Sequence, residues 1–62
     1  MALKFQIVKG KSEQQPYFFR ILSPKGQTLA VSENYVERAS ARRAVLAIIR
    51  TAADAEVEDL AT

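Results

Sequence analysis

The feature that most constrains this fold is residues 32–53, the one long segment with a clear helical period. At about 100° per residue, six apolar side chains fall on one stripe of a helix. These are Ala41, Ala44, Val45, Ile48, Ile49 and Ala52. Arg43 and Arg50 fall on the opposite side, and the run 39–53 contains no Gly or Pro. The segment therefore predicts an amphipathic helix that packs one face on a core.

The start of this helix has two possible positions. Asn34, followed three residues later by Glu37, resembles a capping arrangement. Glu37 could instead be the N-cap residue, with Tyr35 and Val36 still extended. Leu46 is apolar but lies near the polar side, so it is either the shoulder of the core or a residue covered by a second chain.

The segments before the helix alternate apolar and polar residues in the period of a strand. Strands are predicted at residues 3–9, 17–22 and 27–33, joined by a polar hairpin loop at 10–16 and a turn at 23–26. Pro24 suits the second position of that turn and Gly26 the fourth. The side chains expected to face the helix are Leu3, Phe5, Ile7, Tyr17, Phe19, Ile21, Leu29 and Val31. After the helix, residues 55–60 alternate apolar and acidic side chains, which indicates a weak fourth strand or a frayed tail.

Three apolar residues are expected on the sheet face that the helix leaves uncovered. They are Val8, Phe18 and Leu22. They form either an open apolar patch that binds a partner or a set of scattered surface residues of the ordinary kind.

The small size and the residue types absent from the chain restrict how it can be stabilised. Sixty-two residues form at most one domain, 1–62, and the core of so short a chain is marginal. The sequence has no Cys and no His, which excludes disulfides and a Cys/His zinc site and leaves a tight core or self-association. No apolar run approaches the roughly 18 residues of a spanning helix. The first residues lack the apolar region of a signal peptide, so a cytoplasmic location is expected.

The charge is unevenly distributed along the chain. Residues 1–50 carry nine basic and three acidic side chains, a net +6, while residues 51–62 carry four acidic side chains and no basic one, a net −4. The candidate anion or nucleic-acid face consists of Arg38, Arg42, Arg43 and Arg50. Arg20 is expected on the open side of the sheet, where Phe18 is the best candidate for base stacking. The alternative is an ordinary solvated helix face.

The sequence offers little catalytic chemistry. Without Cys or His, a nucleophile would need Lys or a carboxylate as its base, and no motif supplies this arrangement. The tail acids are Asp54, Glu56, Glu58 and Asp59. Their alternation is typical of a solvated edge, with a hard-metal site as the alternative. No catalytic, metal or cofactor site is predicted.

Ser32, Glu33 and Tyr35 lie where the third strand meets the helix. They are either a small polar site or a structural lock. In the second interpretation Ser32 or Glu33 satisfies free backbone groups at the helix start, and Tyr35 packs its ring on the sheet.

The order of these motifs resembles the YegP-like family of bacterial domains of unknown function. The matching residues are Tyr17, Phe19, Arg20, Ile21, Gly26, Ser32, Glu33, Tyr35, Arg38, Ala39, Ser40, Ala41, Val45, Ile48, Val57, Asp59 and Thr62. The sequence departs from the family at Lys25, where Asn is usual, and at Ala44, where Gly is frequent.

The resemblance implies an α+β fold, a β-β-β-α-β unit with an antiparallel sheet and one helix on one face. It also implies an intertwined homodimer that exchanges its C-terminal strand, with Ala55, Val57 and Asp59 in that strand. The predicted function is a non-enzymatic binding or structural module with no cofactor and an unidentified ligand, acting as a homodimer away from membranes. The alternative is a nucleic-acid-binding dimer that uses the basic helix face.

Overall fold

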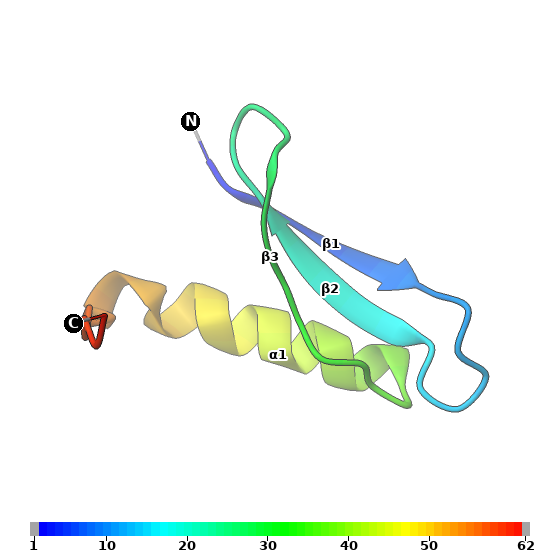
Figure 1. Ribbon diagram of the computed structural model, residues 1–62. Helices are drawn as coiled ribbons and strands as arrows, with labels where there is room; N and C mark the ends of the chain where they lie inside the picture. The colour runs from blue at the N-terminus through cyan, green and yellow to red at the C-terminus, as the bar shows by residue number, and fades with distance from the viewer. Residues whose placement is uncertain (1, 62) are drawn as a thin grey trace.

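The computed structural model describes residues 2–61 as a three-stranded antiparallel sheet with one helix on one face (Figure 1). The strands are β1 (Lys4–Lys9), β2 (Tyr17–Leu22) and β3 (Thr28–Val31), in the spatial order β1-β2-β3. Helix α1 (Arg38–Thr51) follows, and a short 3-10 turn, η1 (Ala52–Asp54), extends it. The α+β class and the three predicted strands are confirmed.

The two hairpins form where turn chemistry predicts them. In the first, the Gly10 N–H donates to the Pro16 carbonyl over 2.6 Å and closes the polar loop. In the second, the Gly26 N–H donates to the Ser23 carbonyl over 2.9 Å, and Gly26 has φ +93°, which a residue with a Cβ rarely adopts. The predicted positions of Pro24 and Gly26 in this turn are therefore confirmed.

The core lies between β2 and the first half of α1. Its buried apolar side chains are Phe19, Ala41 and Val45. The Phe5 ring flanks Phe19, with 6.4 Å between ring centroids. Helix α1 contacts β1 and β2 but not β3, so the sheet is covered on only two of its three strands.

The orientation of β3 differs from the prediction. Ile21, which shares the helix side of the sheet with Phe19, pairs with Ala30, whereas Val31 pairs with Arg20 on the other side. A register irregularity between Ile21 and Leu22 leaves Leu29 as an extra residue in β3. Leu29 and Val31 were expected to face the helix, and that expectation is wrong: Val31 lies on the open side of the sheet, and both side chains are about 60% exposed.

The helix start decides between the two capping alternatives. Glu37 is the N-cap residue with an extended backbone, and its side chain makes no capping hydrogen bond. Asn34 does not cap the helix, because its side-chain amide donates to the Gln15 carbonyl over 3.0 Å and ties the corner to the first hairpin loop. Neither α1 nor η1 has the length and apolar character needed to cross a bilayer within residues 2–61.

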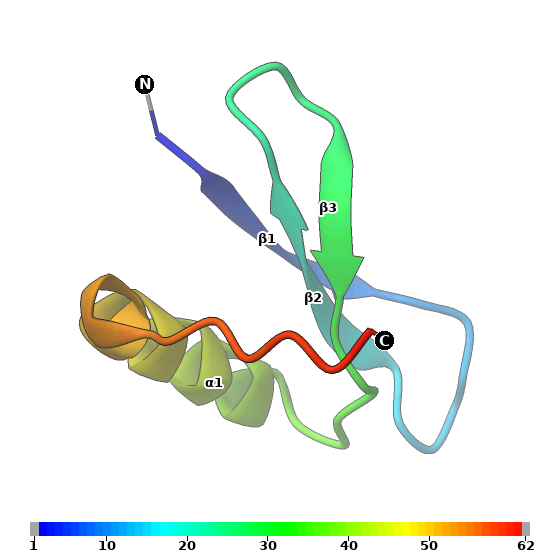
Figure 2. The same ribbon diagram turned by 60° about the vertical axis from the view of Figure 1, so that its left-hand side comes forward.

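No strand follows the helix in the described chain, which ends at residue 61. Residues 55–61, called the arm below, are exposed throughout and continue from η1 as an extended segment, which crosses in front of α1 in the view of Figure 2. The Val57 side chain is 96% exposed and that of Leu60 78%. The predicted fourth strand is therefore absent from the sheet of one chain.

Candidate functional site

The corner between β3 and α1 is built on the backbone of Phe19. The Ser32 N–H donates to the Phe19 carbonyl over 2.9 Å, and the Ser32 hydroxyl oxygen accepts the Phe19 N–H, also over 2.9 Å. The same hydroxyl donates to the Glu33 carbonyl over 2.7 Å. Ser32 therefore satisfies backbone groups of Phe19 in the core strand β2. It was expected to satisfy free backbone groups at the helix start, which lies further along the chain.

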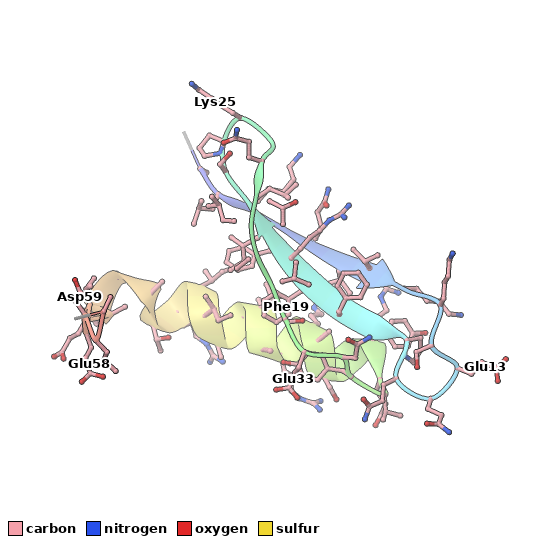
Figure 3. The ribbon with its side chains drawn as sticks, in the orientation of Figure 1. Glu13, Phe19, Lys25, Glu33, Glu58 and Asp59 are labelled. Carbon is pink, nitrogen blue, oxygen red and sulfur yellow. The ribbon has the colours of Figure 1, made fainter. Side chains whose placement is uncertain are left out.

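Tyr35 joins this corner to the sheet through both its backbone and its ring. Its N–H donates to the Tyr17 carbonyl over 2.6 Å, and its carbonyl accepts the Tyr17 N–H over 3.1 Å. Its half-buried ring lies nearly parallel to that of Phe19, with 6.5 Å between centroids and 17° between the planes. Glu33 is exposed (Figure 3). Ser32 and Tyr35 come together around Phe19, and Glu33 stays outside this cluster.

The four arginines of the candidate nucleic-acid face are all exposed, but they do not form one row. Arg38 and Arg42 are one helical turn apart, and a single residue step of about 100° separates Arg42 from Arg43. Arg43 donates through Nη2 to the Ser40 hydroxyl over 3.3 Å. At about 100° per residue, Arg38 and Arg42 point in one direction and Arg43 and Arg50 in another, so the four arginines form two pairs and not one row.

The open face of the sheet carries the predicted apolar residues around one arginine. Val8 pairs with Phe18, and Leu22 pairs with Lys4 and Thr28 in the ladder. Arg20 donates through Nε to the Gln6 side-chain carbonyl over 2.6 Å, so its guanidinium is held within the sheet face. Phe18 packs over Gly10, where an added Cβ would lie 3.3 Å from its ring. This stacking candidate is on the face away from α1, apart from the helix arginines.

The acidic tail does not form a metal site within residues 2–61, where no three acidic side chains come together. Asp54 ends η1, and Glu56, Glu58 and Asp59 follow on the arm, all exposed. Ala55, Val57 and Asp59, the residues predicted for a dimer strand, are exposed and have no place in the ladders of the described sheet.

One hollow was not predicted, at the end of the sheet where β1 finishes and α1 begins. It has a volume of about 310 Å³ and is lined by Ile7, Val8, Lys9, Tyr17 and Arg38. Arg38 was a candidate for the basic helix face and Val8 for the open apolar patch, and the other three residues were not candidates. Lys9 and Tyr17 flank the predicted hairpin loop 10–16 and pair across β1 and β2, as that hairpin requires. The placement of Arg38 beside them is the part that no sequence motif indicated.

Comparison with known proteins identifies the family. The domain family described as "Domain of unknown function (DUF1508)" matches residues 12–59. The chain belongs to this family. A YegP-like relative, "UPF0339 protein Atu0232" from Agrobacterium fabrum (strain C58 / ATCC 33970), is 39% identical over 59 residues, which cover 95% of this chain and 92% of the relative. No solved structure matches. The YegP-like resemblance drawn from the motifs is therefore confirmed.

Proposed function

We propose that this YegP-like protein is a non-enzymatic module that acts as a homodimer, in which the arm of each chain adds a strand to the β3 edge of its partner. The observation that carries the proposal is the arm itself. It is extended, almost fully exposed at Val57, and outside the strand ladders of the described sheet. A segment with the alternation of a strand and no sheet in its own chain has the properties of an exchanged strand.

The β3 edge suits this arm better than the β1 edge. The backbone groups on the outer side of β3 have no partner strand within residues 2–61. Helix α1 leaves the helix side of β3 uncovered, so Ala30 is exposed there. In Figures 1 and 2 the arm leaves α1 on the side where β3 lies, and not on the β1 side. A twofold arrangement in which each arm reaches the partner's β3 would cover Ala30 and bury Val57.

Charge supports the same assembly. The arm carries Glu56, Glu58 and Asp59, whereas residues 1–50 carry a net +6. Bringing the arm of one chain onto the body of another pairs opposite charges, an attraction that salt weakens. The absence of His and Cys from the sequence, together with the scattered carboxylates, supports a non-enzymatic role.

Engineered disulfides test the pairing directly, because the natural chain contains no cysteine. A chain carrying Val57→Cys and Ala30→Cys should oxidise to a covalent dimer, since a disulfide requires Cα atoms within about 7 Å. The matched control carries Val57→Cys and Ile7→Cys, which places the second thiol on β1. Covalent dimers from the first chain and not from the second are expected on a non-reducing gel. A folded monomer by light scattering of the natural chain would overturn the proposal.

A further inference from the structure

The hollow at the end of β1 is formed by three parts of the chain that the fold fixes separately. Lys9 and Tyr17 are cross-strand partners at the end of the β1–β2 ladder. Tyr17 is held a second time by its backbone bridge to Tyr35. Helix α1 begins with Arg38 only three residues after Tyr35, so Arg38 is delivered to the same hollow.

The hollow combines two cations with an apolar wall. Lys9 and Tyr17 are on the helix side of the sheet, like Ile7. They form the last pair of the β1–β2 ladder, at the end of the sheet near the start of α1. The Lys9 Nζ lies 6.0 Å from the centre of the Tyr17 ring. Neither Lys9 nor Arg38 forms an ion pair with a carboxylate within residues 2–61. Two uncompensated cations at an apolar surface favour an anion.

No acidic residue of the described chain is among the side chains that line the hollow, and the acidic residues of the arm lie elsewhere. Glu58 and Asp59 lie beyond the C-terminal end of α1, whereas the hollow lies at its N-terminal end (Figure 3). The exchange of arms proposed above places them at β3, on the other edge of the sheet from β1.

We infer that the hollow lined by Lys9, Tyr17 and Arg38 is a binding site for a small organic anion, a carboxylate or phosphate ester with one compact apolar group. The Arg38 guanidinium can donate two parallel N–H hydrogen bonds to a carboxylate or phosphate, and the flexible Lys9 side chain adds a positive charge. Ile7 and the Tyr17 ring contact the apolar group. The volume of about 310 Å³ is at the lower end of the range for ligand pockets, about 300–1,000 Å³, which limits the ligand to about the size of one aromatic ring.

Titration of the ¹⁵N-labelled full-length protein, followed by amide chemical shifts, tests the site. The probes are benzoate, phenyl phosphate, inorganic phosphate and the neutral benzyl alcohol. Benzoate or phenyl phosphate should produce saturable shifts at Lys9, Tyr17 and Arg38, and the stronger of the two identifies the head group. Inorganic phosphate should bind more weakly because it lacks the apolar group. Shifts of equal affinity with benzyl alcohol would overturn the inference.

Matched variants separate the site from general electrostatic attraction. Replacing both cations, Lys9→Gln with Arg38→Gln, should weaken binding by at least about tenfold, the loss expected from one charge-assisted hydrogen bond. The control, Lys25→Gln with Arg43→Gln, removes the same charge from the β2–β3 turn and from the helix and should bind normally. Equal weakening by both pairs would show non-specific attraction and overturn the inference.

A third variant distinguishes a small ligand from the arm of a second chain. It carries Glu56→Gln, Glu58→Gln and Asp59→Asn, which keep the length and the apolar residues of the arm. Binding of the probes should be the same with or without these changes. If probes bind only to this variant, the hollow is occupied by the partner's arm, and the small-anion site is excluded. That result would also contradict the pairing of the arm with β3, whereas equal weakening by the two cation pairs would overturn the small-anion site alone.

Discussion

The β3 corner and the arm were both expected to contain a strand, and they have opposite environments. Strands were predicted at residues 27–33 and, as a weak fourth strand or a frayed tail, at residues 55–60. The corner is joined to the core by Ser32 and Tyr35, through hydrogen bonds to Phe19 and Tyr17. The arm is exposed along its whole length and pairs with no strand of the described residues.

This difference shows what alternation specifies. A period of two residues assigns side chains to two faces of a strand, but it does not say which sheet the strand joins. The corner satisfies its backbone within the chain, whereas the arm leaves its backbone and Val57 available to another chain. The following experiments test whether the corner stabilises the single chain and whether the arm stabilises the dimer.

Removal of residues 55–62 should have the largest effect. The described part of the chain has only three buried apolar side chains, so a single chain has little stability to lose. If the arm completes the partner's sheet, the truncated protein should lose its dimer and unfold, as measured by light scattering and circular dichroism. A folded dimer without these residues would show that the helix and the first three strands form the interface.

A point substitution in the arm sharpens that test without shortening the chain. Val57→Asp should weaken the dimer, because it would bury an unpaired charge at the proposed interface. Val36→Asp is the matched control, since Val36 is also exposed but lies in the corner loop. Light scattering over a dilution series should show dissociation at higher concentration for Val57→Asp alone.

Truncation of the corner tyrosine should have the next largest effect. Tyr35→Ala removes the ring that stacks on Phe19. A fully buried aromatic costs about 3–5 kcal/mol when truncated, and a half-buried ring should cost about 2–3 kcal/mol of unfolding free energy. Tyr35→Phe keeps the ring and should unfold close to the natural protein in a urea titration. An unchanged midpoint for Tyr35→Ala would contradict a structural role of the corner.

Ser32 should contribute less, and through hydrogen bonding alone. Ser32→Ala leaves the Phe19 N–H without the acceptor it has in the structure. An unpaired backbone donor next to the core costs about 1–3 kcal/mol. Ser32→Thr retains a hydroxyl and should recover most of the loss in the same urea titration. Equal destabilisation by Ala and Thr would show that the hydroxyl is not the stabilising group.

The sequence predicted the parts of this fold that depend on local chemistry. The amphipathic period, the residues of the turn at Pro24 and Gly26, and the extent of β2 all follow from neighbouring residues. The face of β3 was mispredicted because apolar residues occur at exposed positions, and only the pairing of Ile21 with Ala30 decides which side faces the helix.

The candidate site was less predictable because its residues meet only after pairing. Ser32 was assigned to the helix start because it precedes the helix in sequence, but the hairpin brings it to Phe19. Lys9 and Tyr17 flank the predicted hairpin loop, but the position of Arg38 beside them depends on how α1 packs on the sheet. Contacts of this kind depend on which strands pair, and composition and spacing do not encode that choice.

The smallest expected effect concerns the helix arginines. Arg42 and Arg43 are exposed and point to different sides of α1, so changing both to Glu should leave the fold and the dimer unchanged. The stacking candidate Phe18 is on the sheet face away from α1. A nucleic acid bound to the helix arginines could therefore not also stack on this ring. DNA and RNA affinity, measured by fluorescence anisotropy at physiological salt, should therefore be weak both before and after the change. Micromolar binding that the double substitution abolishes would establish the basic helix as a nucleic-acid interface. In that case the polar side of α1, and not only the corner and the arm, would have a function of its own.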